Sequence, residues 1–62
     1  MLRNGRTNAQ LDEVARRVYG EAPRFYERQF NRFRVIGTLR GWKCGEPERR
    51  EEILRAAREV IG

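Results

Sequence analysis

The chain has 62 residues and a formal net charge of +5, with 14 basic residues, 9 acidic residues, one cysteine and no histidine. A single cysteine excludes an intramolecular disulfide, and without histidine the usual zinc-ligand sets cannot be assembled. A chain this short buries only about 60% of the surface that its unfolded form exposes. We therefore expect one domain with a thin core, of the kind that a partner chain helps to stabilise.

The sequence carries few signs of a membrane or a secretory destination. The longest apolar runs, such as residues 35–36 and 60–61, are far short of the roughly 20 residues that span a bilayer. The charged start leads into no apolar stretch of the kind that a signal peptide has. The unpaired thiol of Cys44 fits a reducing compartment, so we predict a cytoplasmic protein. Its parts are a flexible basic arm over residues 1–6 and a single domain over residues 7–62.

The first predicted helix begins at Thr7 or Asn8, because Thr7 and Gln10 have the spacing of a capping box. One apolar face follows at positions i, i+3, i+4 and i+7, formed by Leu11, Val14, Ala15 and Val18. Gly20 accepts the left-handed conformation in which many helices end, so the helix is expected to stop at Tyr19.

The second predicted helix begins near Pro23, whose missing N–H would be unpaired there in any case. Its large apolar side chains fall within one arc of the helix, which we expect to be the core face: Phe25, Tyr26, Phe30, Phe33 and Ile36. Val35 falls on the opposite, polar side. The helix ends at Gly37 or at Arg40, and the pattern does not decide between them. Trp42, in a loop over residues 41–45, is expected to close one end of the core.

The third predicted helix opens with Glu46 and Pro47, and the acidic residues of its first turns suit the positive end of the helix dipole. Its apolar face consists of Ile53, Leu54, Ala56, Ala57, Val60 and Ile61. Short connections join the helices, so the sequence predicts an all-α fold, a compact three-helix bundle. The tight break over residues 19–23 also fits a helix-turn-helix pair.

The basic excess concentrates in residues 18–45, which carry five arginines and Lys43 against two glutamates, giving +4. Opposite the expected core face, the second helix presents a strip of Arg24, Arg28, Asn31, Arg32, Arg34 and Thr38. In the major groove arginine pairs with guanine and asparagine with adenine, while other arginines contact phosphate. We therefore predict that base edges are contacted by Arg24, Arg28, Asn31 and Arg32. Phosphate contacts are predicted for Arg16, Arg17, Arg34, Arg40 and Lys43.

The main functional prediction is a small DNA-binding protein, a regulator of transcription or a nucleoid or phage protein, acting as a dimer without cofactor or metal. RNA is a less favoured ligand of the same strip. The alternative is a protein-interaction module or assembly subunit whose core a partner chain completes. An enzyme is not expected, because no histidine can activate Cys44 and the carboxylates have the positions of helix-start and surface residues.

Aromatic residues are the second notable feature of the middle of the chain. All six lie between Tyr19 and Trp42, interleaved with arginines. Exposed rings beside arginines suit single-stranded nucleic acid, because bases stack on them. The helical spacing of these rings instead favours a core role.

Overall fold

A computed structural model describes the backbone of residues 2–62 and the side chains of residues 8–62. The predicted flexible arm covers residues 1–6. Met1 and the side chains of the whole arm lie outside the described residues, so the arm stays a prediction. The structure consists of three α-helices and one 3-10 turn: α1 (Leu2–Tyr19), α2 (Phe25–Arg40), η1 (Pro47–Arg49) and α3 (Arg50–Ile61).

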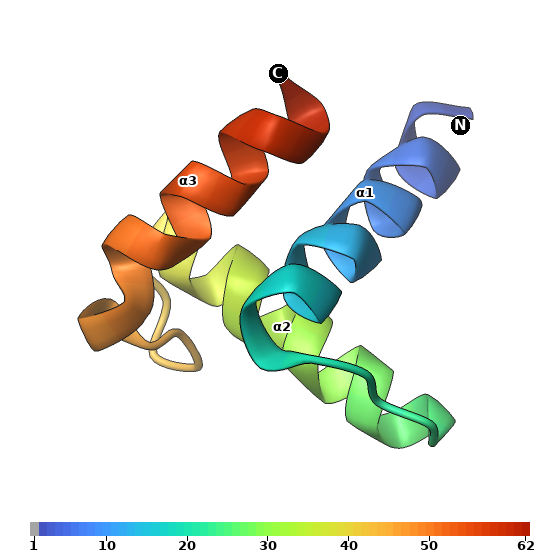
Figure 1. The fold of residues 1–62 in the computed structure, drawn as a ribbon, viewed down its shortest axis with the longest axis horizontal. Coiled ribbons are helices and arrows are strands. Elements are labelled where there is room, and N and C mark those ends of the chain that lie inside the picture. Colours follow the sequence, from blue (N-terminus) through green and yellow to red (C-terminus); the bar gives the residue numbers. More distant parts are fainter. Residues whose placement is uncertain (1) are drawn as a thin grey trace.

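Two of the helices form a pair that the third one crosses. In Figure 1, α1 and α3 lie side by side and run in opposite directions, while α2 passes behind both. The start of α1 and the end of α3 therefore lie at the same end of the molecule. The predicted all-α three-helix bundle is confirmed.

The helices end at the positions that the glycines predict, whereas they do not begin at the predicted positions. α1 ends at Tyr19 as predicted, with Gly20 at φ +92°. α2 runs to Arg40, past Gly37, and Gly41 caps it with φ +75°. The starts differ, because α1 begins at Leu2, earlier than predicted, and α2 begins two positions after Pro23.

The core is small and takes side chains from all three helices. Its buried members are Leu11, Val14 and Ala15 of α1, Val35 of α2, and Ile53 and Ala56 of α3. A partly buried ring surrounds them, formed by Val18, Tyr19, Ile36, Leu39, Ala57 and Val60. The apolar faces predicted for the first and third helices are thus confirmed, except at two positions of α3: Leu54 is partly buried outside the core and its ring, and Ile61 is 47% exposed.

The core face predicted for α2 is wrong for its four aromatic residues, although Ile36 does pack against the core. Val35, which the pattern places on the polar side, is fully buried, whereas the four rings of the predicted core face are 49–67% exposed. Trp42, predicted to close the core, is also 50% exposed. The helix is therefore turned so that its aromatic residues face away from α1 and α3.

The loop after α2 explains this rotation, because it fixes the side of α2 on which α3 packs. The amide of Glu46 donates to Oγ1 of Thr38 at 2.6 Å, and Thr38 is itself buried, at 5% exposure. Gly45 lies directly against the backbone of Gly37 and Thr38. The chain thus leaves α2 across the side that carries Val35 and Thr38, and α3 covers that side. The opposing surfaces of α1 and α3 are small, formed by residues such as Ala15 and Ala56, and one valine fills the space between them.

Thr38 holds the loop to the helix, so its hydroxyl is expected to matter for stability. Oγ1 donates to the carbonyl oxygen of Arg34 at 2.8 Å and accepts the amide of Glu46. The isosteric change Thr38→Val leaves that amide without its acceptor and is expected to cost about 1–3 kcal/mol of unfolding free energy, measured by urea denaturation. Thr38→Ser keeps the hydroxyl and serves as the control. Equal stability of the Thr38→Val variant and the natural chain would show that this bond contributes nothing.

Candidate interaction surface

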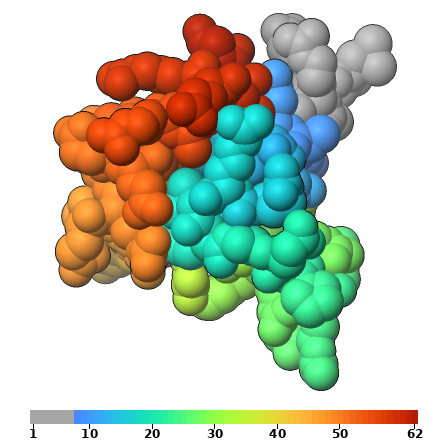
Figure 2. Space-filling model, viewed as in Figure 1, coloured from blue at the N-terminus to red at the C-terminus, as the bar shows by residue number. Residues whose placement is uncertain are grey.

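The main surface feature is a row of aromatic side chains along the outer side of α2, called here the aromatic face. It comprises Phe25, Tyr26, Phe30 and Phe33, which are 67%, 62%, 58% and 49% exposed. The start of α2 and the connection before it project from the body of the molecule as a lobe (Figure 2). The helical spacing found in the sequence is therefore real, but it aligns the rings toward solvent.

Arginines lie against these rings. The guanidinium of Arg34 is 4.7 Å from the centre of the Phe30 ring, and that of Arg40 is 5.5 Å from the Trp42 ring. Nη1 of Arg24 is 3.5 Å from the phenolic oxygen of Tyr26. A cation over the face of an aromatic ring is attracted by the electron density of that ring. We call these three arginines, Arg24, Arg34 and Arg40, the cationic rim of the aromatic face.

The cationic rim differs from Arg16, Arg17, Arg32 and Arg49 in its lack of acidic partners, a lack that it shares among the described side chains with Arg28, Arg50, Arg55 and Arg58. Among the described side chains, no carboxylate lies within ion-pair distance of any of its three members. Exposed Lys43, in the loop after α2, is likewise without an ion pair in that part of the chain. The positive charge on this side of the molecule is therefore not neutralised within the domain.

Arg16 and Arg17 of α1 are placed differently. Arg16 contacts Glu13 at 2.6 Å, and Arg17 contacts both Glu13 at 3.0 Å and Glu59 of α3 at 3.1 Å. The hydrogen bonds from Arg16 and Arg17 lower the pKa of Glu13 to about 2. The residues predicted to contact phosphate thus fall into two groups, a neutralised pair on α1 and an unpaired group of Arg34, Arg40 and Lys43.

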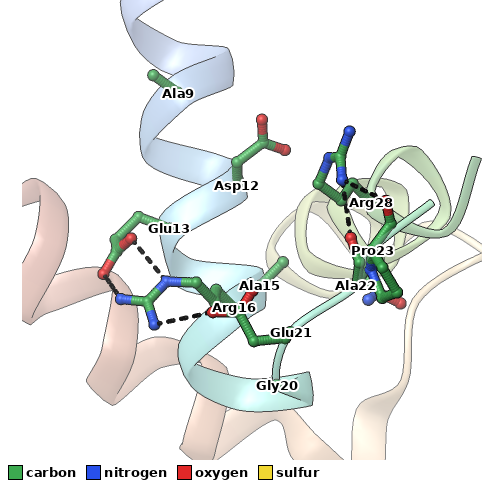
Figure 3. A pocket seen from close by; sticks show the side chains of 11 residues that line it. Ala9, Asp12, Glu13, Ala15, Arg16, Gly20, Glu21, Ala22, Pro23 and Arg28 are labelled. Atoms are coloured by element: carbon green, nitrogen blue, oxygen red, sulfur yellow. Dashed lines mark hydrogen bonds and ion pairs between the residues drawn. The ribbon is translucent and has the colours of Figure 1, made fainter. Parts of the chain in front are cut away.

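Three of the four residues predicted to read bases lie on the side of α2 that faces α1. Nη1 of Arg28 donates to the carbonyl oxygens of Ala22 at 2.9 Å and Pro23 at 3.0 Å (Figure 3). Nη1 of Arg32 contacts Oδ1 of Asp12 on α1 at 3.1 Å, and Asn31 is partly buried. Arg24 and Arg28 are exposed, as predicted for an outward strip, whereas Asn31 and Arg32 are partly buried. Their role in binding stays a prediction.

A shallow pocket of about 240 Å³ lies between α1, α2 and their connection. Its charged lining includes Asp12, Glu13, Arg16, Glu21 and Arg28 (Figure 3). Arg16 pairs with Glu13 and approaches Glu21 at 3.8 Å, so much of this charge is engaged within the pocket itself.

A second polar contact ties α1 to the loop before α3. The hydroxyl of Tyr19 donates to Oε1 of Glu46 at 2.6 Å. Burial raises the pKa of Tyr19 above its ordinary value, and the hydrogen bond to Glu46 raises it further. Arg34 and Arg49 each lie 5.3 Å from the Tyr19 ring centre. This ring is thus built into the domain, unlike the rings of the aromatic face.

The sequence reasoning missed the aromatic face as a functional surface, although one signal could have found it. The aliphatic faces of α1 and α3 consist of small and medium side chains such as Val14, Ala15 and Ala56. They offer too little surface to cover four aromatic rings of α2 and Trp42 as well. A surplus of large rings over the surface available to bury them indicates that some rings remain outside.

Comparison with protein-family models, with curated proteins and with solved structures gives no match to this chain. None of the helices in residues 2–62 combines the length and the apolar character needed to cross a membrane.

Proposed function

We propose that this chain is a protein-interaction module whose aromatic face is covered by a partner chain. The observation that carries the proposal is the exposure of Phe25, Tyr26, Phe30 and Phe33 along successive turns of one helix. Large contiguous apolar patches on a small protein mark interaction sites. Aromatic residues and arginine are also the side chains enriched in the centres of protein interfaces.

The energy available at this face is enough for a specific but moderate interaction. A buried aromatic side chain removes 150–250 Å² from water, so covering the exposed half or more of each ring gives about 2–3 kcal/mol. Four rings together supply roughly 10 kcal/mol, which is comparable with the 4–15 kcal/mol cost of association. The face therefore needs complementary polar contacts, for which the cationic rim is placed.

Nucleic-acid binding is the second candidate, favoured by the unpaired cations beside exposed rings. Arg24, Arg40 and Lys43 are exposed and without ion pairs among the described side chains. Major-groove reading by α2 has less support, because Arg28 and Arg32 make contacts within the domain. Duplex DNA titrated at about 50 and 200 mM salt separates the candidates, since phosphate contacts give affinities that fall steeply with salt.

The direct test is a photocrosslinker placed on the aromatic face in the cells that encode the protein. Benzoylphenylalanine at position 30 is expected to give discrete adducts that protease removes and nuclease does not. The matched control carries the same group at position 55, on the exposed side of α3. Adducts sensitive to nuclease would support the second candidate, and no adduct above the control level would contradict both.

A further inference from the structure

We infer that the partner of the aromatic face is an amphipathic helix with acidic side chains flanking its apolar stripe. The inference rests on the proposed function and names the chemistry of the partner. It follows from the combination of four exposed rings with three arginines whose guanidinium groups form no ion pair with the described side chains. The positive rim and the acidic partner are complementary in charge.

The rim arginines differ from the ion-paired arginines of the domain in the groups that they contact, and the rim is the set of unpaired arginines that lies beside exposed rings. Arg16, Arg17, Arg32 and Arg49 each contact a carboxylate. The rim arginines instead contact rings of Tyr19, Phe30 and Trp42 or the hydroxyl of Tyr26. Opposite charges across an interface speed association and exclude partners of the wrong sign. A partner with carboxylates at its edges supplies the counter-charge that this side of the domain lacks.

The position of the guanidinium groups over the rings suits carboxylates in particular. A guanidinium that stacks on a ring keeps its in-plane N–H groups free, and these form two-point hydrogen bonds with a carboxylate. The guanidinium carbons of Arg34 and Arg40 lie over the Phe30 and Trp42 rings, at 4.7 Å and 5.5 Å from the ring centres. A glutamate or aspartate at the margin of a partner helix meets them edge-on while its apolar side chains contact the rings.

The same stacking disfavours single-stranded nucleic acid. Bases bind such surfaces by stacking on open ring faces. Here the domain's own arginines already lie over one face of Phe30 and of Trp42. A base must displace Arg34 or Arg40 or use the remaining face, whereas the side chains of a helix fit around the ring edges.

The length of the face sets the size of the partner. From Phe25 to Phe33 the helix rises about 12 Å at 1.5 Å per residue, so a partner helix of about three turns covers it. The face lies along the outer side of a single helix, so the partner packs along α2 as a neighbouring helix. Apolar residues at positions i, i+3, i+4 and i+7 of the partner provide the matching stripe.

The test uses three fluorescein-labelled helical peptides of 18 residues with the same leucine stripe and with glutamate, glutamine or lysine at the flanking positions. The natural chain is expected to bind the glutamate peptide at least tenfold more tightly than the glutamine peptide at about 50 mM salt, and the lysine peptide least. Fluorescence anisotropy gives the three affinities, with a labelled 12-nucleotide oligothymidylate as a fourth probe.

Two double variants with the same change in charge locate the effect. Arg24→Gln with Arg34→Gln is expected to reduce binding of the glutamate peptide to the level of the glutamine peptide. The control, Arg55→Gln with Arg58→Gln, changes two exposed residues of α3 and is expected to lose less than twofold. Circular dichroism melting of both variants confirms that the domain is folded.

The outcomes separate this inference from the proposed function. Equal binding of all three peptides, abolished by Phe30→Ser, would overturn the acidic partner and leave the interaction face standing. Binding of the oligothymidylate alone would overturn both. No binding of any probe to the natural chain would also overturn the acidic partner, and the photocrosslink at position 30 would then decide the proposed function by itself.

Discussion

Val35→Ser is expected to remove most of the stability of the isolated domain, whereas Phe30→Ser costs about 1 kcal/mol or less. Val35 is fully buried, so its loss leaves a cavity and a hydroxyl in the core, a cost of about 2–4 kcal/mol. A single core in a chain this short supplies about 3–5 kcal/mol in total. Phe30 is 58% exposed, and its replacement removes only a partial contact with the helix surface and Arg34.

Urea denaturation followed by circular dichroism measures both changes under the same conditions. The two variants distinguish the orientations of α2, because the helical pattern of the sequence predicts the larger loss of stability for Phe30→Ser, with Phe30 in the core and Val35 outside. A larger loss for Phe30→Ser than for Val35→Ser would show that α2 is rotated toward the orientation that the pattern suggests.

Gly45→Ala is expected to destabilise the domain by about 1–3 kcal/mol or more, because there is no room for a side chain. A Cβ at this position would lie 2.5 Å from the amide nitrogen of Thr38 and 2.6 Å from the carbonyl carbon of Gly37. Both atoms belong to the backbone of α2, so relief requires the whole loop to move away from the helix. That movement also breaks the bond between Glu46 and Thr38.

Gly20→Ala is the matched control, since a Cβ there meets nothing within 4 Å and only the left-handed backbone at φ +92° opposes it. Its expected cost is about 1 kcal/mol. Thermal melting of the two variants ranks them. If Gly45→Ala is no more costly than Gly20→Ala, the loop does not pack against α2 as described.

The sequence predicts the helices of this domain well because their signals are local. Gly20 and Gly41 end helices where a left-handed residue is needed, and Pro47 starts the turn before α3. The apolar faces of α1 and α3 are also correct, since each of these helices has one clear apolar side. Local signals of this kind do not depend on how the helices pack.

The orientation of α2 could not be predicted in the same way, because this helix has two sides that can each face a core. One side carries the rings, and the other carries Val35, Thr38 and long arginines that extend past the core to solvent or to an acid such as Asp12. Which of the two sides faces the core depends on the contact between Gly45 and α2. The helical period does not predict this contact, because Gly45 lies outside the helix. An arc of large apolar residues therefore identified the aromatic face and assigned it to the wrong environment.

The exposure of Tyr26 compared with that of Tyr19 tests the central claim most directly. Photochemically induced nuclear polarisation enhances the signals of tyrosine and tryptophan rings that a flavin dye can reach. Tyr26 and Trp42 are 62% and 50% exposed, so both are expected to give strong signals, while Tyr19, partly buried and bonded to Glu46, gives a weak one. A silent Tyr26 beside a strongly polarised Tyr19 in the monomer would contradict an outward aromatic face and the interaction surface built on it.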